Sequence, residues 1–83
     1  MQVIIKPINT KNVSDLPIGV IFTTTDPEHI GMMFVATDEY ANDNASLRRC
    51  LVLDGGEHYR AGLIFNIQCN TQATVLGELV GAI

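Results

Sequence analysis

The 83-residue sequence predicts a single all-β domain, folded as a small, partly open barrel of five or six short strands. Short runs rich in β-branched and aromatic residues recur along the chain, and clusters of Gly, Pro, Asn and Asp separate them. A chain of this length supplies one hydrophobic core, and two full sheets would need more residues. We therefore expect one domain over residues 1–83, with at most one short helical turn.

The clearest strand pattern lies in the middle of the chain, over residues 47–53. Leucines stand at positions 47, 51 and 53, and the intervening set holds Arg48, Cys50 and Val52. A period of two is typical of a strand, whose successive side chains point to opposite faces. The Asp54-Gly55-Gly56 run then supplies the positive φ angles of a tight hairpin turn. We expect the chain to reverse there and the other strands to pair around this one.

Two strands are predicted near the start of the chain. Residues 3–6 suit an edge strand, because Pro7 removes a backbone donor just after them. A polar connector over residues 9–15 leads to Leu16-Pro17-Ile18-Gly19, where proline and glycine mark a turn. Residues 20–25 are β-branched or aromatic throughout, which favours a second strand.

A single helical turn is predicted between the second and third strands. Asp26 suits the capping position and Pro27 the first helical position, while Gly31 ends the turn. Residues 32–37 then form the third strand, and its alternation places three apolar side chains on one face: Met32, Phe34 and Ala36.

Residues 38–46 form the most polar segment of the chain. Asparagine and aspartate favour turns through hydrogen bonds from their side chains to the backbone. We interpret the segment as an exposed loop, with a short helix from Glu39 to Ala45 as the alternative.

Two further strands are predicted after the Asp54-Gly55-Gly56 turn, over residues 63–69 and 73–80. The end of the chain is apolar on both strand faces, through Leu76, Leu79, Val80, Ala82 and Ile83. A domain this small does not easily bury both faces, and an exposed apolar edge invites pairing. We therefore expect the chain to associate with itself through this C-terminal strand.

The charge composition argues against a nucleic-acid partner. The formal net charge is −4, and only five residues are lysine or arginine. Nucleic-acid binders collect phosphates with a basic patch, whereas the adjacent pair Arg48 and Arg49 points to opposite faces of a strand. No run approaches the ~20 apolar residues of a membrane span. We therefore expect neither a nucleic acid nor a membrane as a partner.

The two cysteines, Cys50 and Cys69, lie in apolar, strand-like runs and lack the CxxC spacing of metal sites. We expect two free, buried thiols in a reducing cytoplasm. The first residues also lack the apolar core and cleavage site of a signal peptide, which agrees with a cytoplasmic localisation.

No constellation of residues predicts an enzyme. His29 and His58 stand beside acidic residues, but both lie in polar turns and neither shows metal-ligand spacing. Gly55-Gly56 precedes no helix, so these glycines belong to a turn and not to a phosphate-binding loop. We expect no catalytic residue, no metal and no cofactor.

The block from Val13 to Asp54 resembles a loose group of short phage and prophage proteins. These open with a Leu-Pro-x-Gly-x-x-Phe phrase and reach a Leu-x-x-Gly hairpin after a strand; here the phrases are Leu16-Pro17-Ile18-Gly19-Val20-Ile21-Phe22 and Leu51-Val52-Leu53-Asp54-Gly55-Gly56. The resemblance implies an SH3-like barrel. It transfers no functional residue, and the apolar tail from Leu76 to Ile83 departs from the pattern.

Several functions remain open. The first is a non-enzymatic protein-interaction module, encoded by a phage, that binds and inhibits a host factor in the host cytoplasm. A small, acidic, cysteine-poor domain suits this role, because a negative surface can mimic or cover a nucleic-acid site. The alternatives are a homo-oligomeric structural or virion-associated subunit, and a binder of a small ligand such as a nucleotide.

Tyrosine and arginine, which commonly anchor interfaces, occur in two predicted loops. Tyr40 stands in the 38–46 loop, and Tyr59 and Arg60 follow the Asp54-Gly55-Gly56 turn. We expect the two loops to lie at one end of the domain and to form an acidic, aromatic-centred binding face made of Asp38, Glu39, Tyr40, Asp43, His58, Tyr59 and Arg60. The alternative is that both tyrosines belong to the packing of the domain.

Overall fold

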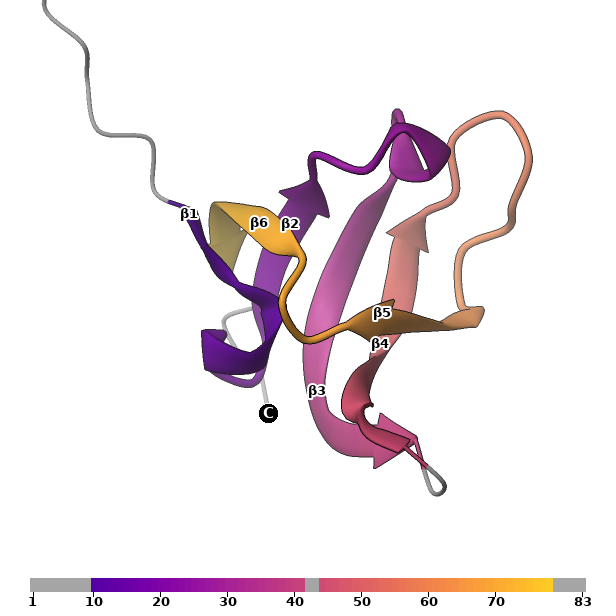
Figure 1. Ribbon diagram of the computed structural model, residues 1–83. Helices are drawn as coiled ribbons and strands as arrows, with labels where there is room; N and C mark the ends of the chain where they lie inside the picture. Colours follow the sequence, from indigo (N-terminus) through magenta and orange to yellow (C-terminus); the bar gives the residue numbers. More distant parts are fainter. Residues whose placement is uncertain (1–9, 42–43, 79–83) are drawn as a thin grey trace, which may run out of the picture.

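The computed structural model describes residues 10–41 and 44–78, which form six antiparallel strands in one sheet (Figure 1). The strands are β1 (Thr10–Asn12), β2 (Val20–Thr24), β3 (Met33–Ala41), β4 (Asn44–Asp54), β5 (Ile64–Gln68) and β6 (Gln72–Glu78). Two single 3-10 turns, η1 (Val13–Asp15) and η2 (Pro27–His29), are the helical segments of the described residues. The all-β prediction is confirmed, but the expectation of at most one short helical turn is wrong, because η1 forms in addition to η2.

The sheet is open, with the strand order β1-β6-β2-β3-β4-β5. Its two ends nevertheless approach each other through η1. The Val13 N–H donates to the Thr71 carbonyl at 3.0 Å and the Ser14 N–H donates to the Cys69 carbonyl at 3.1 Å. Both acceptors lie in the turn between β5 and β6, where the chain crosses from one end of the sheet towards the other (Figure 1). The sheet is therefore strongly curled around its inner face.

The inner face of the sheet encloses one hydrophobic core. The Phe22 and Phe34 rings stack at its centre with a centroid distance of 5.5 Å. The predicted face of the third strand is confirmed, since all three of its residues are buried. The core cluster consists of Val13, Leu16, Val20, Phe22, Met32, Phe34, Ala36, Cys50, Val52, Ile67 and Ala73.

On β4 the buried face is the one that holds an arginine. Arg48, Cys50 and Val52 point into the core, whereas the leucines at 47, 51 and 53 lie on the outer face and are partly or fully exposed. The alternation predicted from the sequence is present, but the leucine-rich face is not the core face.

The buried guanidinium of Arg48 is bonded entirely to backbone carbonyls. Nη1 donates to the carbonyls of Val13 and Leu16, each at 2.7 Å. Nε and Nη2 donate to the Thr37 carbonyl at 2.9 and 2.6 Å. The guanidinium also lies 5.8 Å from the ring centroid of Tyr40. These hydrogen bonds from one side chain of β4 hold η1 against β3. A buried charge is tolerated only when its hydrogen-bond donors are satisfied, which explains why the guanidinium is fully bonded.

Several predicted boundaries need correction. The segment over residues 38–46 is not a loop, because β3 continues to Ala41 and β4 begins at Asn44; the alternative helix is also wrong. The β3–β4 ladder shifts register between Ala36 and Tyr40, where β3 contains extra residues. This irregularity allows a polar sequence to remain paired. The predicted connector over residues 9–15 contains β1 and η1.

Three predictions concern, in whole or in part, residues outside the described ones. The expected strand over residues 3–6 lies there, as do Asp43 and the apolar end from Leu79 to Ile83. Within the described part of the C-terminal strand, β6 pairs with β2 as far as Glu78. Self-association through this strand stays a prediction.

Replacing Arg48 with methionine is expected to destabilise the fold strongly. The substitution keeps a long apolar side chain but removes the guanidinium donors from the carbonyls of Val13, Leu16 and Thr37, a loss of about 3 kcal/mol or more. Arg49→Met is the matched control on the same strand. Arg49 makes a surface ion pair with Glu39 at 3.4 Å, which is worth only about 0.5 kcal/mol. Urea unfolding of both variants checks this, and similar losses would contradict the role of Arg48.

Candidate functional site

The η2 turn begins with a side-chain cap. The Asp26 Oδ1 accepts the Glu28 N–H at 2.9 Å, and Pro27 occupies the first helical position. Gly31 ends the turn with a φ of 77°, a conformation that favours glycine. The helical turn predicted from the sequence is confirmed.

A longer loop over residues 55–63 replaces the tight hairpin that the sequence predicts after β4. It begins with an aspartate cap, in which the Asp54 Oδ1 accepts the Gly56 N–H at 2.9 Å. It closes on β4, where the Gly62 N–H donates to the Val52 carbonyl and the Val52 N–H donates to the Leu63 carbonyl, each at 2.8 Å. The chain does reverse direction here, as predicted, but over residues 55–63 and not in two residues.

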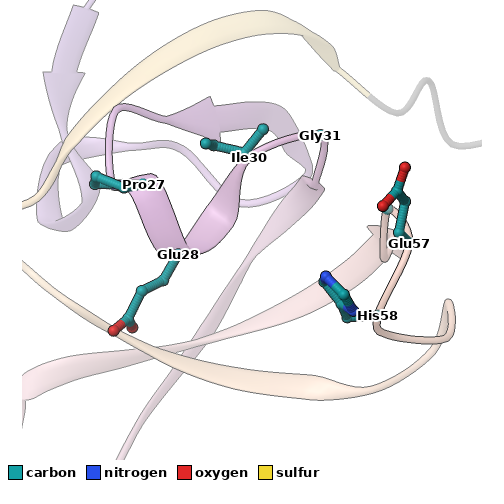
Figure 2. Close-up of a pocket in the computed structure, with 7 residues that line it drawn as sticks. Pro27, Glu28, Ile30, Gly31, Glu57 and His58 are labelled. Carbon is teal, nitrogen blue, oxygen red and sulfur yellow. The ribbon is translucent and has the colours of Figure 1, made fainter.

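A hollow of about 410 Å³ separates η2 from this loop; we call it the loop groove. Figure 2 shows Glu28 and Ile30 on the η2 side and Glu57 and His58 on the loop side. Ile30 is 79% exposed although it is apolar. The two sides meet at the base, where a Cβ on Gly56 would lie 3.4 Å from the Ile30 carbonyl oxygen. The groove is lined by Pro27, Glu28, Ile30, Gly31, Gly56, Glu57 and His58.

A second hollow, of about 290 Å³, lies between η2 and β5; we call it the edge groove. Glu28 contributes to both grooves, and its side chain extends away from the 55–63 loop (Figure 2). The edge groove is lined by Asp26, Glu28, His29, Leu47, Asn66, Ile67, Gln68 and Thr71.

Aromatic contacts hold η2 and the 55–63 loop on the core. The His29 ring lies 5.2 Å from Phe34 and 6.2 Å from Phe65 between centroids, and its Nδ1 is 2.8 Å from the Thr24 Oγ1. From the loop, Tyr59 packs edge-on against the same Phe65 ring at 4.8 Å. Both walls of the loop groove therefore rest on Phe65.

The residues predicted to form one binding face lie in two separate places. Asp38, Glu39 and Tyr40 are near the end of β3, which pairs with the start of β4, whereas His58, Tyr59 and Arg60 are in the loop after β4. The two groups therefore lie at opposite ends of β4 (Figure 1). The expected single face is therefore wrong. The physical reason is that β3 and β4 remain paired through the polar segment, which lengthens the hairpin.

Some of these side chains have partners within the chain. Glu39 pairs with Arg49, and the Tyr40 ring lies beside the Arg48 guanidinium. Tyr59 packs on Phe65. The role of the seven predicted residues in binding a partner stays a prediction.

Ile30 and the exposed edge of β5 were not predicted from the sequence. A signal for Ile30 was present, because an isoleucine directly before Gly31 belongs to no alternating run that would bury it. The edge of β5 had no such local signal, since strand order is decided by the whole chain.

The thiols offer little nucleophilic chemistry. Both cysteines are free, as predicted, but Cys50 is buried and Cys69 only partly so. Burial raises the pKa of Cys50 from 9.0 to about 12, against the opposing effect of the Arg48 charge. The Cys50 thiol is protonated at neutral pH. Stability falls as pH rises from about 9 to about 12, because the unfolded chain then ionises this thiol while the folded chain does not.

Within residues 10–41 and 44–78, no group of three or more His, Cys, Asp and Glu side chains is arranged to hold a metal ion. Nor does that part of the chain contain a helix long and apolar enough to cross a membrane. Comparison of the chain with models of known families, with curated proteins and with solved structures finds no match in any of the three.

Gly55→Ala is expected to destabilise the 55–63 loop. A Cβ at this position would fall on the backbone carbonyl of Tyr59, and an overlap of this kind costs about 2 kcal/mol. Gly77→Ala is the matched control, because a Cβ there meets no other atom within 4 Å. Thermal unfolding of the two variants checks the prediction, and equal stability would contradict the close approach.

Alkylation is expected to distinguish the two thiols. In the folded protein, iodoacetamide modifies Cys69 and leaves the buried Cys50 unmodified, because the thiolate is the reacting form. In urea both react. Mass spectrometry of the alkylated peptides measures this, and rapid labelling of Cys50 in the folded chain would contradict its burial.

Proposed function

We propose that the chain is a non-enzymatic protein-interaction module, which contacts a partner protein through the loop groove and the exposed side chain of Ile30. The observation that carries the proposal is the position of Ile30, an apolar side chain 79% exposed at the rim of a hollow. Burying such a side chain against a partner is favourable, by about 1.5–3 kcal/mol for full burial.

The walls of the loop groove support recognition because they are preorganised. Aspartate caps fix the start of both turns, and the aromatic contacts of His29 and Tyr59 seat them on Phe65. A surface already held in its binding conformation loses less entropy when a partner docks.

The polar groups of the groove favour contact over catalysis. General acid–base chemistry needs side chains within hydrogen-bond reach of one reacting point. Figure 2 shows the His58 ring pointing towards η2 and the Glu57 carboxylate pointing in a different direction. These groups suit hydrogen bonds at the rim of an interface.

A phage origin and inhibition of a host factor form part of the proposal, and they rest on the resemblance of residues 13–54 alone. We also propose that the curled sheet is a partly open SH3-like barrel. The bonds from η1 to the β5–β6 turn support this, because they draw the two ends of the sheet together.

Site-specific photocrosslinking tests the interaction surface. The full chain carries a benzophenone side chain at position 30 and is expressed in the cells that naturally produce the protein. We expect discrete adducts with a partner protein, which excess unlabelled chain competes away. Ile30→Asp is expected to compete poorly, since losing an interface anchor weakens binding by about 1 kcal/mol or more.

Position 18 is the matched control. Ile18 is 68% exposed and apolar but precedes β2, whereas Ile30 follows it, so the two lie at opposite ends of that strand. Ile18→Asp is expected to compete as well as the unsubstituted chain. The proposal is wrong if both positions yield the same adducts, if neither yields any, or if Ile30→Asp competes normally.

A further inference from the structure

The β5 strand is an edge of the described sheet, because β4 is its only neighbour there. An edge strand presents unpaired N–H and C=O groups, and proteins usually protect it with charges, proline or short length. The opposite edge has such protection, since β1 contains three residues and one of them is Lys11. The segment from Leu63 to Cys69 contains no charged residue and no proline. The β5 edge is therefore unprotected.

The hydrogen-bond pattern identifies which backbone groups point outwards. Leu63 and Cys69 bond to β4, through the Val52 N–H to Leu63 carbonyl bond and the Cys69 N–H to Ser46 carbonyl bond. In an antiparallel ladder, alternate residues of a strand face the neighbour. Phe65 and Ile67 therefore also face β4, and the backbone groups of Ile64 and Asn66 face away from it.

The edge groove gives this open edge a charged wall. Asp26 and Glu28 line the groove from η2, and Asn66 and Gln68 line it from β5. No lysine or arginine is among the lining residues, and the chain as a whole carries a net charge of −4. A strand placed along β5 would therefore meet two carboxylates without a compensating cation among the residues that line the groove.

We infer that the β5 edge binds an extended segment of a partner protein in which lysine or arginine alternates with apolar residues. The backbone groups of Ile64 and Asn66 pair with the segment as an added strand, a recognised way to bind peptides. Asp26 and Glu28 attract its cationic side chains. The inference goes beyond the proposed function, because it concerns the edge groove and not the loop groove.

The alternation follows from the two faces of the sheet. On the inner side, His29 of η2 packs against Phe65, so side chains of an added strand that point inwards approach the η2 carboxylates. On the outer side, Ile64 is 45% exposed and pairs with Leu51. Side chains that point outwards extend this apolar pair or, beside Asn66, approach its ladder partner Arg49, which disfavours a second cation on that side. Successive residues of a strand point to opposite faces, so basic and apolar positions must alternate.

Charge complementarity favours this occupant over a second copy of the chain. A copy paired through its own β5 would contribute an uncharged strand and bring a second Asp26 and Glu28 close to the interface. Its strand would leave the carboxylates of the first copy unpaired. A basic segment neutralises them.

The probe is an acetylated and amidated peptide of sequence Lys-Val-Lys-Val-Lys-Val, titrated into the full-length protein labelled with ¹⁵N. We expect slowed hydrogen exchange at the Ile64 and Asn66 amides. Those of Phe65 and Ile67 are the internal control, because they already bond to β4. The peptide Glu-Val-Glu-Val-Glu-Val has the same apolar pattern and is expected not to bind.

Isosteric variants test the role of the carboxylates. Asp26→Asn with Glu28→Gln keeps the cap of η2 and removes two charges; we expect affinity for the lysine peptide to fall about fivefold, as for two exposed ion pairs. Asp15→Asn with Glu78→Gln changes the net charge equally at exposed positions outside the groove, and is expected to retain affinity.

Four outcomes of the peptide experiments would overturn the inference. They are no binding at millimolar peptide, equal binding of the glutamate peptide, exchange changes that map away from β5, and equal loss of affinity in the two double variants. Protection of Ile64 and Asn66 that rises with protein concentration alone would assign the edge to a second copy and overturn it as well. Each result is independent of crosslinking at Ile30, so this inference and the proposed function can fail separately.

Discussion

The buried guanidinium of Arg48 is the interaction on which the remaining structure depends. It is 3% exposed, and its partners are the backbone carbonyls of Val13, Leu16 and Thr37, not a carboxylate. Carbonyl dipoles satisfy its donors without adding a second charge that must also lose its hydration. These hydrogen bonds fix the position of η1 relative to the paired strands β3 and β4. A hydrophobic side chain in the same place would fill the volume but would not specify where η1 lies.

The position of η1 in turn decides how far the sheet curls. Its N–H groups bond to the Thr71 and Cys69 carbonyls, which places the β5–β6 turn against the first elements of the chain. β6 then pairs between β1 and β2, while β5 remains beside β4 at the other end of the order. The two ends of the sheet are thus joined where η1 bonds to the β5–β6 turn, whereas β5 has no further strand beside it in the described sheet. That open edge lies next to η2, and both grooves are consequences of this arrangement.

Sequence patterns predicted the local features and missed those that depend on contacts between distant segments. The Asp26-Pro27 cap and the Met32, Phe34 and Ala36 face follow from neighbouring residues, and both are present. Arg48 is different. Its partners are 11 to 35 residues away, so no local pattern distinguishes a buried arginine from an exposed one. The same limit explains the loop predicted in error over residues 38–46, where pairing with β4 overrides the turn preference of the polar residues.

The η2 turn, which we propose as part of the binding surface, is held in place by contacts on both of its sides. The His29 ring and the Asp26 cap fix this single turn from both sides, so it needs no further helix to hold its shape. Because the turn is short, its side chains diverge: Ile30 reaches the loop groove, Asp26 reaches the edge groove, and Glu28 contributes to both. An apolar anchor and a pair of carboxylates are thereby presented to different sides from five consecutive residues. Among the described residues that line the two grooves, Glu28 is shared, so a partner bound in one groove would change the electrostatics of the other through its carboxylate.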